Sequence, residues 1–147
     1  MGQGMSYDEN NIFARILRGE LPSEQVFEDD ETLAIMDIMP RADGHVLVIP
    51  KTPARNLLDA TPKQLAACMK TANTVAQAMM AAFKADGITL QQFSEAAGGQ
   101  EVFHLHFHLI PRKECVRMRP PGPDNMTKPE VLREHAARIR SSLASIS

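Results

Sequence analysis

The 147-residue sequence contains no tryptophan, one tyrosine and six phenylalanines, so large aromatic side chains are scarce. It has only two cysteines, Cys68 and Cys115, and their separation fits neither a disulfide framework nor a zinc motif. A chain without disulfides is typical of a reducing compartment. We therefore expect the protein in the cytoplasm.

Long hydrophobic runs and a strong charge of one sign are also missing. No apolar segment approaches the roughly 20 residues that a membrane-spanning helix needs, so we expect no membrane partner. The formal net charge of −2 provides no electrostatic basis for binding nucleic acid. With 44% hydrophobic and 23% charged residues, the composition is that of one soluble domain with a single core.

The hydrophobic pattern predicts an α+β fold. Short links between successive strands favour an antiparallel sheet of about five strands, with a short N-terminal helix and one long helix. The expected helices are 9–18, 62–86 and 129–144, and the expected strands are 26–28, 32–36, 45–49, 88–93 and 103–110. We expect residues 1–8 to be disordered and residues 113–147 to form a C-terminal extension with a helix.

The long helix carries clear end signals. Thr61 can cap it, Gln64 completes a capping box, and Gly87 is a typical residue to end it. A stripe of alanine and methionine along this helix could serve a second copy of the chain as well as the core.

Three of the five histidines occupy alternate positions in the segment 104-HLHFHLIP-111. In a strand, alternate side chains share a face, so we expect His104, His106 and His108 on one face. The apolar residues between them would then point into the core. A polar strand face without a function has no need for three copies of so rare a residue.

Two kinds of site suit such a row. Three neutral imidazoles and a water can bind zinc, but ligands spread along one flat strand converge poorly on a tetrahedral ion. Alternatively, one imidazole can attack phosphorus while its neighbours donate hydrogen bonds to the phosphate oxygens. Both interpretations follow from the residues alone.

The segment resembles the His-x-His-x-His signature of the histidine triad (HIT) family, in which apolar residues follow the histidines. The resemblance extends to Asp37, Ile38 and 44-GHVLVIPK-51, to 98-GGQEVFHLHFHLIPR-112, and to the opening 12-IFARILRGELPS-23. It covers about residues 10–112, so we assign residues 9–112 to a HIT domain. The bacterial members of the Hint branch are the most similar in character.

This resemblance implies a HIT fold that pairs into homodimers. It also implies hydrolysis of nucleoside 5′-phosphoramidates or related purine nucleotide conjugates, such as AMP conjugates, without metal or cofactor. Two alternatives stay open: a nucleotide-binding module with little turnover that acts through partners, and a histidine-based metal protein.

The resemblance also assigns roles to the histidines. His106 would be the nucleophile, with its tautomer set by the backbone carbonyl of His104. His108 would bond a phosphate oxygen, and the His104 side chain would bond His45. Gln100 would lie near the scissile bond and the leaving group.

The nucleotide would be held by a second group of residues. Asp37 corresponds to the carboxylate that accepts both ribose hydroxyls, a paired acceptance that suits a carboxylate. Other residues would contact the base or the phosphate side, although the apolar ones could equally be plain core. They are Ile12, Phe13, Ile16, Ile35, Ile38, Ser94, Glu101 and Val102.

The sequence departs from the family pattern in three places. Asn11 and Ala14 occupy the positions of a Cys-x-x-Cys pair in zinc-bearing relatives, so we expect no structural zinc. Ser94 replaces a longer asparagine that contacts the nucleotide. Glu101 replaces a hydroxyl donor; an ionised carboxylate cannot donate and suits a cationic amine leaving group better than a phosphate.

Overall fold

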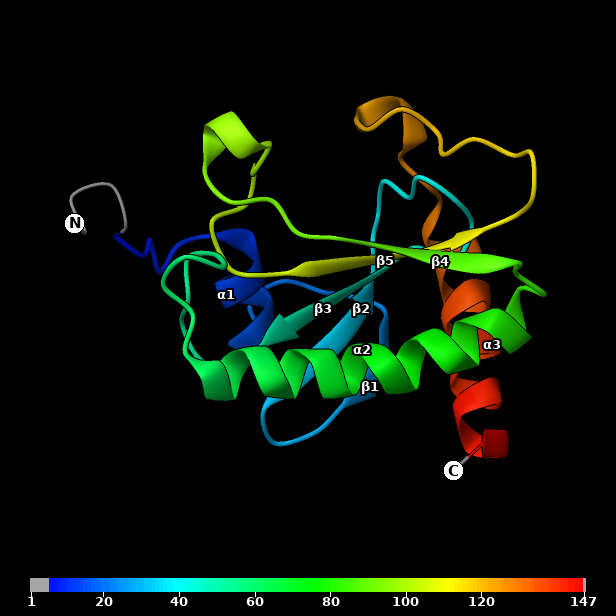
Figure 1. Ribbon diagram of the computed structural model, residues 1–147, viewed down its shortest axis with the longest axis horizontal. Coiled ribbons are helices and arrows are strands. Elements are labelled where there is room, and N and C mark those ends of the chain that lie inside the picture. The colour runs from blue at the N-terminus through cyan, green and yellow to red at the C-terminus, as the bar shows by residue number, and fades with distance from the viewer. Residues whose placement is uncertain (1–5, 147) are drawn as a thin grey trace.

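The computed structural model describes residues 6–146, and its centre is a five-stranded antiparallel sheet in the order β1-β2-β3-β5-β4 (Figure 1). This confirms the predicted α+β class and the antiparallel sheet. The strands are β1 (Gln25–Glu28), β2 (Thr32–Met36), β3 (Val46–Pro50), β4 (Gly87–Gln91) and β5 (Phe107–Arg112). The helices are α1 (Ile12–Leu17), α2 (Pro62–Ala82) and α3 (Pro129–Ile146), with 3-10 turns η1 (Ala96–Gly98) and η2 (Pro123–Asn125).

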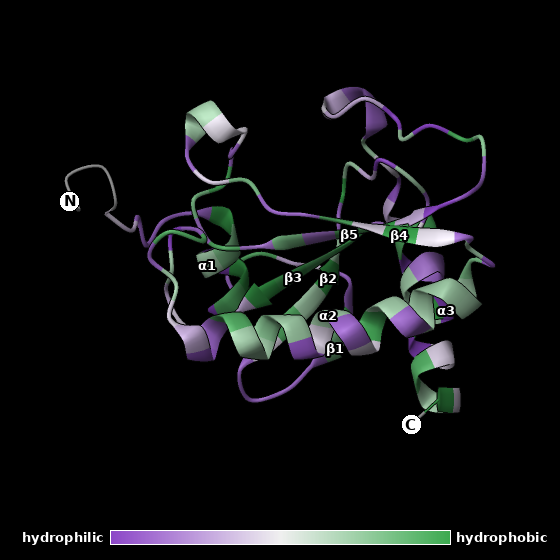
Figure 2. Cartoon of the chain, in the orientation of Figure 1, coloured by the Kyte–Doolittle hydropathy of each residue, from purple (hydrophilic) through white to green (hydrophobic). Residues whose placement is uncertain are grey.

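The two faces of the sheet are covered differently. Every residue of β2 and β3 is buried, which requires cover on both sides. Ala34 and Val48 belong to the larger core under α2 and α3, whereas Ile35 and Leu47 belong to a smaller cluster with Phe13 of α1. Figure 2 shows the hydrophobic colour on β2 and β3 and the hydrophilic colour in the loop that joins β1 to β2. We call the two sides the helix side and the α1 side.

Small residues let the helices pack closely on the helix side. Ala72, Ala78 and Ala136 are almost fully buried, and Met79 fills space between them. Met79 is flexible enough to fill an irregular gap. The scarcity of aromatic residues in the sequence is therefore matched by a core of alanine, methionine and branched aliphatic side chains.

The helix α2 begins as predicted and ends earlier. Thr61 and Gln64 form the expected capping box. The helix ends at Ala82 rather than at residue 86, because Lys84 takes a left-handed conformation with φ 49°. Gly87 consequently opens β4 instead of ending the helix.

The last strand starts later than predicted. β5 begins at Phe107, so His104 and His106 precede it rather than lie in it. The ladder with β3 stops at the Val48–Phe107 pair, since β3 itself ends at Pro50, which has no N–H to donate. The N–H of Leu105 donates instead to the carbonyl of Ala54, in the loop after β3.

Two segments lie outside the predicted domain, one at the N-terminus and one at the C-terminus. Residues 1–5 of the segment expected to be disordered lie outside the described residues. Of its remainder, Ser6 accepts a hydrogen bond from Arg55 and Tyr7 contacts His104. At the other end, α3 lies close to the predicted 129–144 and packs against α2 and β1. Within residues 6–146, no helix has both the length and the hydropathy for a bilayer crossing.

We predict that Gly44→Ala destabilises the fold more than Gly19→Ala does. Both glycines have positive φ, at 89° and 79°, so both variants lose about 1–2 kcal/mol to backbone strain. A Cβ at position 44 would also lie 2.5 Å from the ring of Phe83, which adds about 1–3 kcal/mol, whereas at position 19 nothing lies within 4 Å. Urea unfolding measures the difference, and equal losses in the two variants would contradict the close packing of Phe83.

Candidate active site

Four histidines gather on the α1 side of the sheet. His108 lies in β5, His106 just before it, and His45 just before β3, while Phe107 and Leu109 point into the opposite core. The ring centroids of His106 and His108 are 5.1 Å apart, as are those of His45 and His108. The alternation predicted from the sequence therefore continues through residues 105–109, although the strand itself is shorter.

The predicted bond between His104 and His45 is wrong. His45 Nε2 lies 2.9 Å from His108 Nδ1, whereas His104 contacts Tyr7 and the carbonyl of Pro50. The register explains this, because Leu47 pairs with His108 and places His45 diagonally beside it. His104 lies toward the other end of β3, beside Pro50.

The tautomer of His106 follows from one hydrogen bond. Its Nδ1 lies 2.7 Å from the backbone oxygen of His104, which can only accept, so Nδ1 carries the proton. In the neutral ring, Nε2 then keeps its lone pair. No hydrogen bond within residues 6–146 engages this Nε2. This is the contact with the His104 carbonyl that the resemblance implied.

A chain of donors fixes the tautomers of His45 and His108. The backbone N–H of Arg41 donates to His45 Nδ1 over 3.0 Å, which leaves the proton of neutral His45 on Nε2. This Nε2–H donates to His108 Nδ1, so the proton of His108 also lies on Nε2. His106 and His108 therefore present opposite groups to a ligand: a lone pair and an N–H donor.

Burial keeps these imidazoles neutral. It lowers the pKa of His45 and of His108 to about 3 and that of His104 to about 4, with smaller contributions from neighbouring cationic groups. Burial also lowers the pKa of His106, against an opposing effect of its hydrogen bond to His104. At neutral pH the row consists of neutral donors and acceptors.

Asp37 stands beside this row. Its Oδ1 accepts the N–H of Met39 at 2.8 Å, and its Oδ2 lies 3.4 Å from His45 Nε2. Burial raises the pKa of this carboxyl. Ligand atoms of Asp37, His45 and His108 lie within 4.8 Å of one another, a spacing that could hold a metal ion. However, the Arg41 N–H places a proton on the His45 nitrogen that faces this space, and a metal needs a lone pair there.

Gln100 is buried and fully bonded to protein groups. Its Oε1 accepts from Asn56 Nδ2 and from the N–H of Glu95, and its Nε2 donates to the carbonyls of Arg55 and Val102. Glu95 also receives two hydrogen bonds from the Arg55 guanidinium, at 2.7 and 2.9 Å. This network connects the loop before the histidines to the loop after β3. Gln100 therefore holds the loop that leads to the histidine row.

Sequence reasoning missed three members of that network, Arg55, Asn56 and Glu95. They lie in loops about 40 residues apart, and no periodic or motif signal connects them. Asn56 is fully buried and joins Glu95 to Gln100. A buried polar network of this kind holds one loop conformation only when each member is bonded.

The apolar residues predicted to contact the base, which we call the clamp, divide into two parts. Phe13 and Ile35 are buried, and the Phe13 ring meets His106 edge to face at 4.9 Å. Ile12 and Ile38 are 45% and 49% exposed, so they are accessible to a ligand. Ile16 and Val102 lie at the margin of the same cluster, which also contains three residues that the prediction omitted: Leu33, Leu47 and Ile49.

Ser94 and Glu101 have no bond to the histidines within the described part of the chain. Ser94 exchanges hydrogen bonds with Gln92 at 3.1 Å, and Glu101 is exposed on the loop that leads to the row. Any part they take in binding would therefore depend on direct contact with a ligand.

The C-terminal extension braces the loop that carries Asp37. Arg119 donates to the carbonyl of Pro40 and to Asp43, and its backbone N–H donates to the carbonyl of Arg41. The N–H of Thr127 donates to the carbonyl of Ile38. Residues 113–127 thus hold the loop whose Arg41 N–H sets the tautomer of His45.

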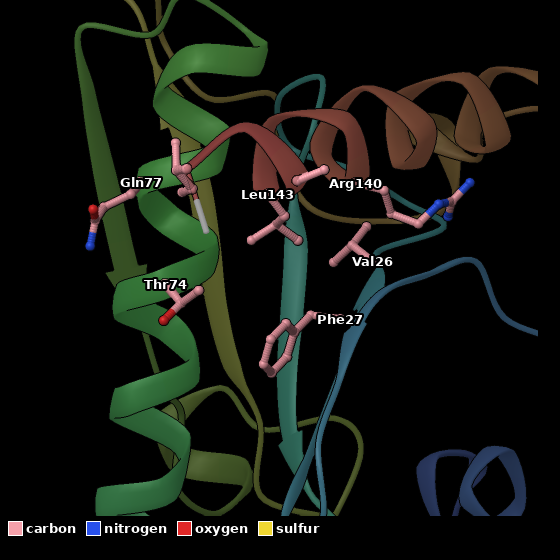
Figure 3. A pocket seen from close by; sticks show the side chains of 8 residues that line it. Val26, Phe27, Thr74, Gln77, Arg140 and Leu143 are labelled. Carbon is pink, nitrogen blue, oxygen red and sulfur yellow. The ribbon is translucent and has the colours of Figure 1, made fainter.

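A cavity of about 490 Å³ lies on the helix side, between β1, α2 and α3 (Figure 3). Its lining is mostly apolar and includes Val26, Phe27 and Leu143. Arg140 contributes the charge in the lining. It offers no pair of groups for acid-base or nucleophilic chemistry. The reactive arrangement of the molecule is the histidine row on the α1 side.

Comparison with known proteins gives a consistent set of relatives. The family model described as HIT domain matches residues 18–115. The chain is 35% identical over 128 residues to Adenylylsulfatase HINT3 of Arabidopsis thaliana, which covers 87% of this chain and 61% of that protein's length. It is 36% identical to Adenosine 5′-monophosphoramidase HNT1 of Saccharomyces cerevisiae over 78% of this chain and 70% of that one.

A solved structure supports the same relationship. The Hit-like protein involved in cell-cycle regulation from Bartonella henselae is 51% identical, with a TM-score of 0.88 over 93% of this chain and 98% of that chain.

We predict that the free energy of unfolding falls as the pH is lowered from 6.5 toward 4. The folded pKa values of His45, His104 and His108 lie below the ordinary value, so their stabilisation is complete above about pH 6.5 and is lost below it. Each histidine contributes about 1.4 kcal/mol per pH unit, partly offset by Asp37, whose raised pKa acts in the opposite direction.

Urea unfolding at pH 7, 6 and 5 measures this slope. His108→Gln removes one titrating group while an amide oxygen can still accept from His45, so its slope should be smaller by about 1.4 kcal/mol per pH unit. A stability that is the same at pH 7 and pH 5 would show that the histidines are not buried as described.

Proposed function

This chain belongs to the HIT family, and on that premise we propose that it is a hydrolase of purine nucleotide conjugates, above all nucleoside 5′-phosphoramidates. The observation that carries the proposal is the unprotonated Nε2 of His106, held by the bond from Nδ1 to the His104 carbonyl. The names of the Arabidopsis and yeast relatives, an adenylylsulfatase and an adenosine 5′-monophosphoramidase, support adenylyl compounds as the substrate class.

The first step is attack of His106 Nε2 on the α-phosphorus. A bond forms between nitrogen and phosphorus, the bond from phosphorus to the leaving nitrogen breaks, and the leaving amine takes up a proton from solvent. The nucleotidyl group is then carried on His106, whose Nδ1–H stays bonded to the His104 carbonyl. In the second step water attacks phosphorus, the bond to His106 breaks, and the nucleoside monophosphate leaves with a proton released to solvent.

The neighbouring groups serve this step by position and by charge. The Nε2–H of His108 can donate to a non-bridging phosphate oxygen as negative charge gathers there. Because burial lowers the pKa of His106, its Nε2 lone pair is available at neutral pH. Phosphoryl transfer depends mainly on such positioning, and no metal is needed for these steps.

The nucleoside would lie against Asp37 and the exposed part of the clamp. Asp37 Oδ2 would accept hydrogen bonds from the ribose hydroxyls, and Ile12 and Ile38 would cover the base. Aliphatic side chains offer few donors or acceptors, so the clamp would hold purines without choosing sharply between them. Glu101, exposed on the loop before the row, favours a cationic amine as the leaving group.

We further propose a homodimer in the cytoplasm. The edge strand β4 has one unpaired side within the described chain, and Leu90 on it is 46% exposed. Met69 on α2 is also exposed. An open strand edge and apolar side chains of this kind suit pairing with a second copy.

We predict a transient covalent adduct of one nucleotidyl group when the protein turns over adenosine 5′-phosphoramidate. Rapid mixing followed by an acid-free quench and intact-mass measurement detects it. His106→Ala should show no adduct and lose about four orders of magnitude in kcat, because no other described group offers a lone pair in its place.

The control is the affinity of His106→Ala for AMP, which should stay within a few-fold of the parent. If the parent binds AMP but shows neither adduct nor turnover, the hydrolase proposal fails, and a nucleotide-binding module that acts through partners replaces it.

We predict that Asp37→Asn lowers kcat/KM about 10–100-fold, the loss expected when a charged acceptor of the ribose hydroxyls is removed. The matched experiment uses a substrate without the 2′- and 3′-hydroxyls. On this substrate the kcat/KM of the parent should also fall about 10–100-fold. The kcat/KM of the variant should be nearly the same on this substrate as on the one with both hydroxyls. Equal losses in the two proteins would show that Asp37 does not bind the sugar.

A further inference from the structure

Tyr7 lies outside the family match and contacts the histidine row. Its hydroxyl lies 2.6 Å from His104 Nδ1, and the two rings meet edge to face with centroids 5.6 Å apart. His104 is 1% exposed and Tyr7 is half-buried. The segment that carries Tyr7 therefore forms part of the wall around the row.

The direction of this hydrogen bond is determined by the other side of the ring. His104 Nε2 lies 2.8 Å from the carbonyl of Pro50, which can only accept, so Nε2 carries the proton. Neutral His104 then has an acceptor at Nδ1, and the Tyr7 hydroxyl must donate to it. Burial keeps His104 neutral, since it lowers the pKa of this residue to about 4.

Two hydrogen bonds, both made by His104, connect Tyr7 to the nucleophile, and a third holds the His104 ring. Tyr7 donates to His104, His104 donates to Pro50, and the backbone carbonyl of His104 accepts from His106 Nδ1. The ring of His104 is held at both nitrogens, and this restrains the backbone whose carbonyl sets the tautomer of His106. Residues 104–106 lie outside β5, so no ladder does this for them.

The segment before α1 is held by a second contact. The Arg55 guanidinium donates to the carbonyl of Ser6 over 2.9 Å, and it also binds Glu95 and stacks over the ring of Phe103 at 4.3 Å. One side chain thereby joins the Tyr7 segment to the loop that precedes the row.

We infer that Tyr7 is a positioning residue for the reaction: its hydroxyl holds the His104 ring and, through the His104 carbonyl, the orientation of the His106 nucleophile. The catalytic part of this inference rests on the proposed hydrolase function, whereas the tautomers of the histidines do not. Within residues 6–146, no hydrogen bond or ring contact joins Tyr7 directly to His106. Its loss should therefore lower the rate and leave substrate binding nearly unchanged.

The test compares Tyr7→Phe with Thr71→Val. Tyr7→Phe keeps the ring and removes the hydroxyl. Thr71→Val also removes one hydroxyl from a pair 2.6 Å apart, that of Thr71 and Thr32, but on the helix side away from the row. Both variants lose a short hydrogen bond, so a loss of stability alone would affect them alike.

We predict that Tyr7→Phe lowers kcat about tenfold, with KM and AMP affinity within twofold of the parent, because about one hydrogen bond of positioning is lost. Thr71→Val should retain the parental kcat. In nitrogen NMR spectra at neutral pH, Tyr7→Phe should move the Nδ1 signal of His104 toward that of an unbonded nitrogen and shift the ring signals of His106. Unchanged His104 and His106 signals, or a kcat loss that Thr71→Val shares, would overturn the inference.

A measurement on the unmodified protein keeps the test independent of variants and of activity. Tyr7 is the only tyrosine and the sequence has no tryptophan, so ultraviolet titration of the phenol reports this residue alone. Burial raises the pKa of Tyr7 above its usual value of about 10, against a smaller lowering by the Asn11 side chain. Donation of the phenol proton to His104 also favours the protonated form. Titration at the ordinary value would show that Tyr7 does not donate to His104 and would overturn the inference even if the protein hydrolyses its substrate. A raised value together with a hydrogen-bonded Nδ1 signal of His104, but without any turnover, would leave the positioning of the row supported and the hydrolase proposal rejected.

Discussion

The hydrogen bond from His106 Nδ1 to the backbone oxygen of His104 determines what the rest of the site can do. It needs a carbonyl that is not used by a strand ladder, and the chain provides one by leaving the sheet before Phe107. Pro50 ends the neighbouring strand without an N–H, and Leu105 bonds Ala54 instead. The early end of the strand is thus what leaves the His104 carbonyl available to orient the His106 ring.

The histidines stay neutral because they are buried. They are buried by loops that no strand pairing holds in place. The loop of residues 92–106 is tied by Gln100 and by the Arg55–Glu95 pair. The loop that carries Asp37 is tied from the C-terminal extension by Arg119. Loops carry the reactive groups, and a network of satisfied polar side chains gives them the rigidity that a strand would otherwise provide.

The fold was largely predictable because hydrophobic periodicity is local. Alternation of core and ligand-facing residues identified the strands and the side of His106, and the capping signals at Thr61 and Gln64 identified the start of α2. The errors occurred where a distant contact decides: the end of α2 at Ala82, the start of β5, and the partner of His45. Arg55, Asn56 and Glu95 could not be predicted, since only the folded chain brings their loops together.

The three histidines of the row differ in the hydrogen-bond partner of the Nδ1 atom. His104 accepts a hydrogen bond from Tyr7, His106 donates one to a carbonyl, and His108 accepts one from His45. At His106 and His108 this partner fixes the tautomer, so the atom turned to a ligand is a lone pair at His106 and a donor at His108. The two roles that we propose for this row of identical side chains, a nucleophile and a hydrogen-bond donor to phosphate, thus arise from backbone register and from neighbours rather than from its own sequence.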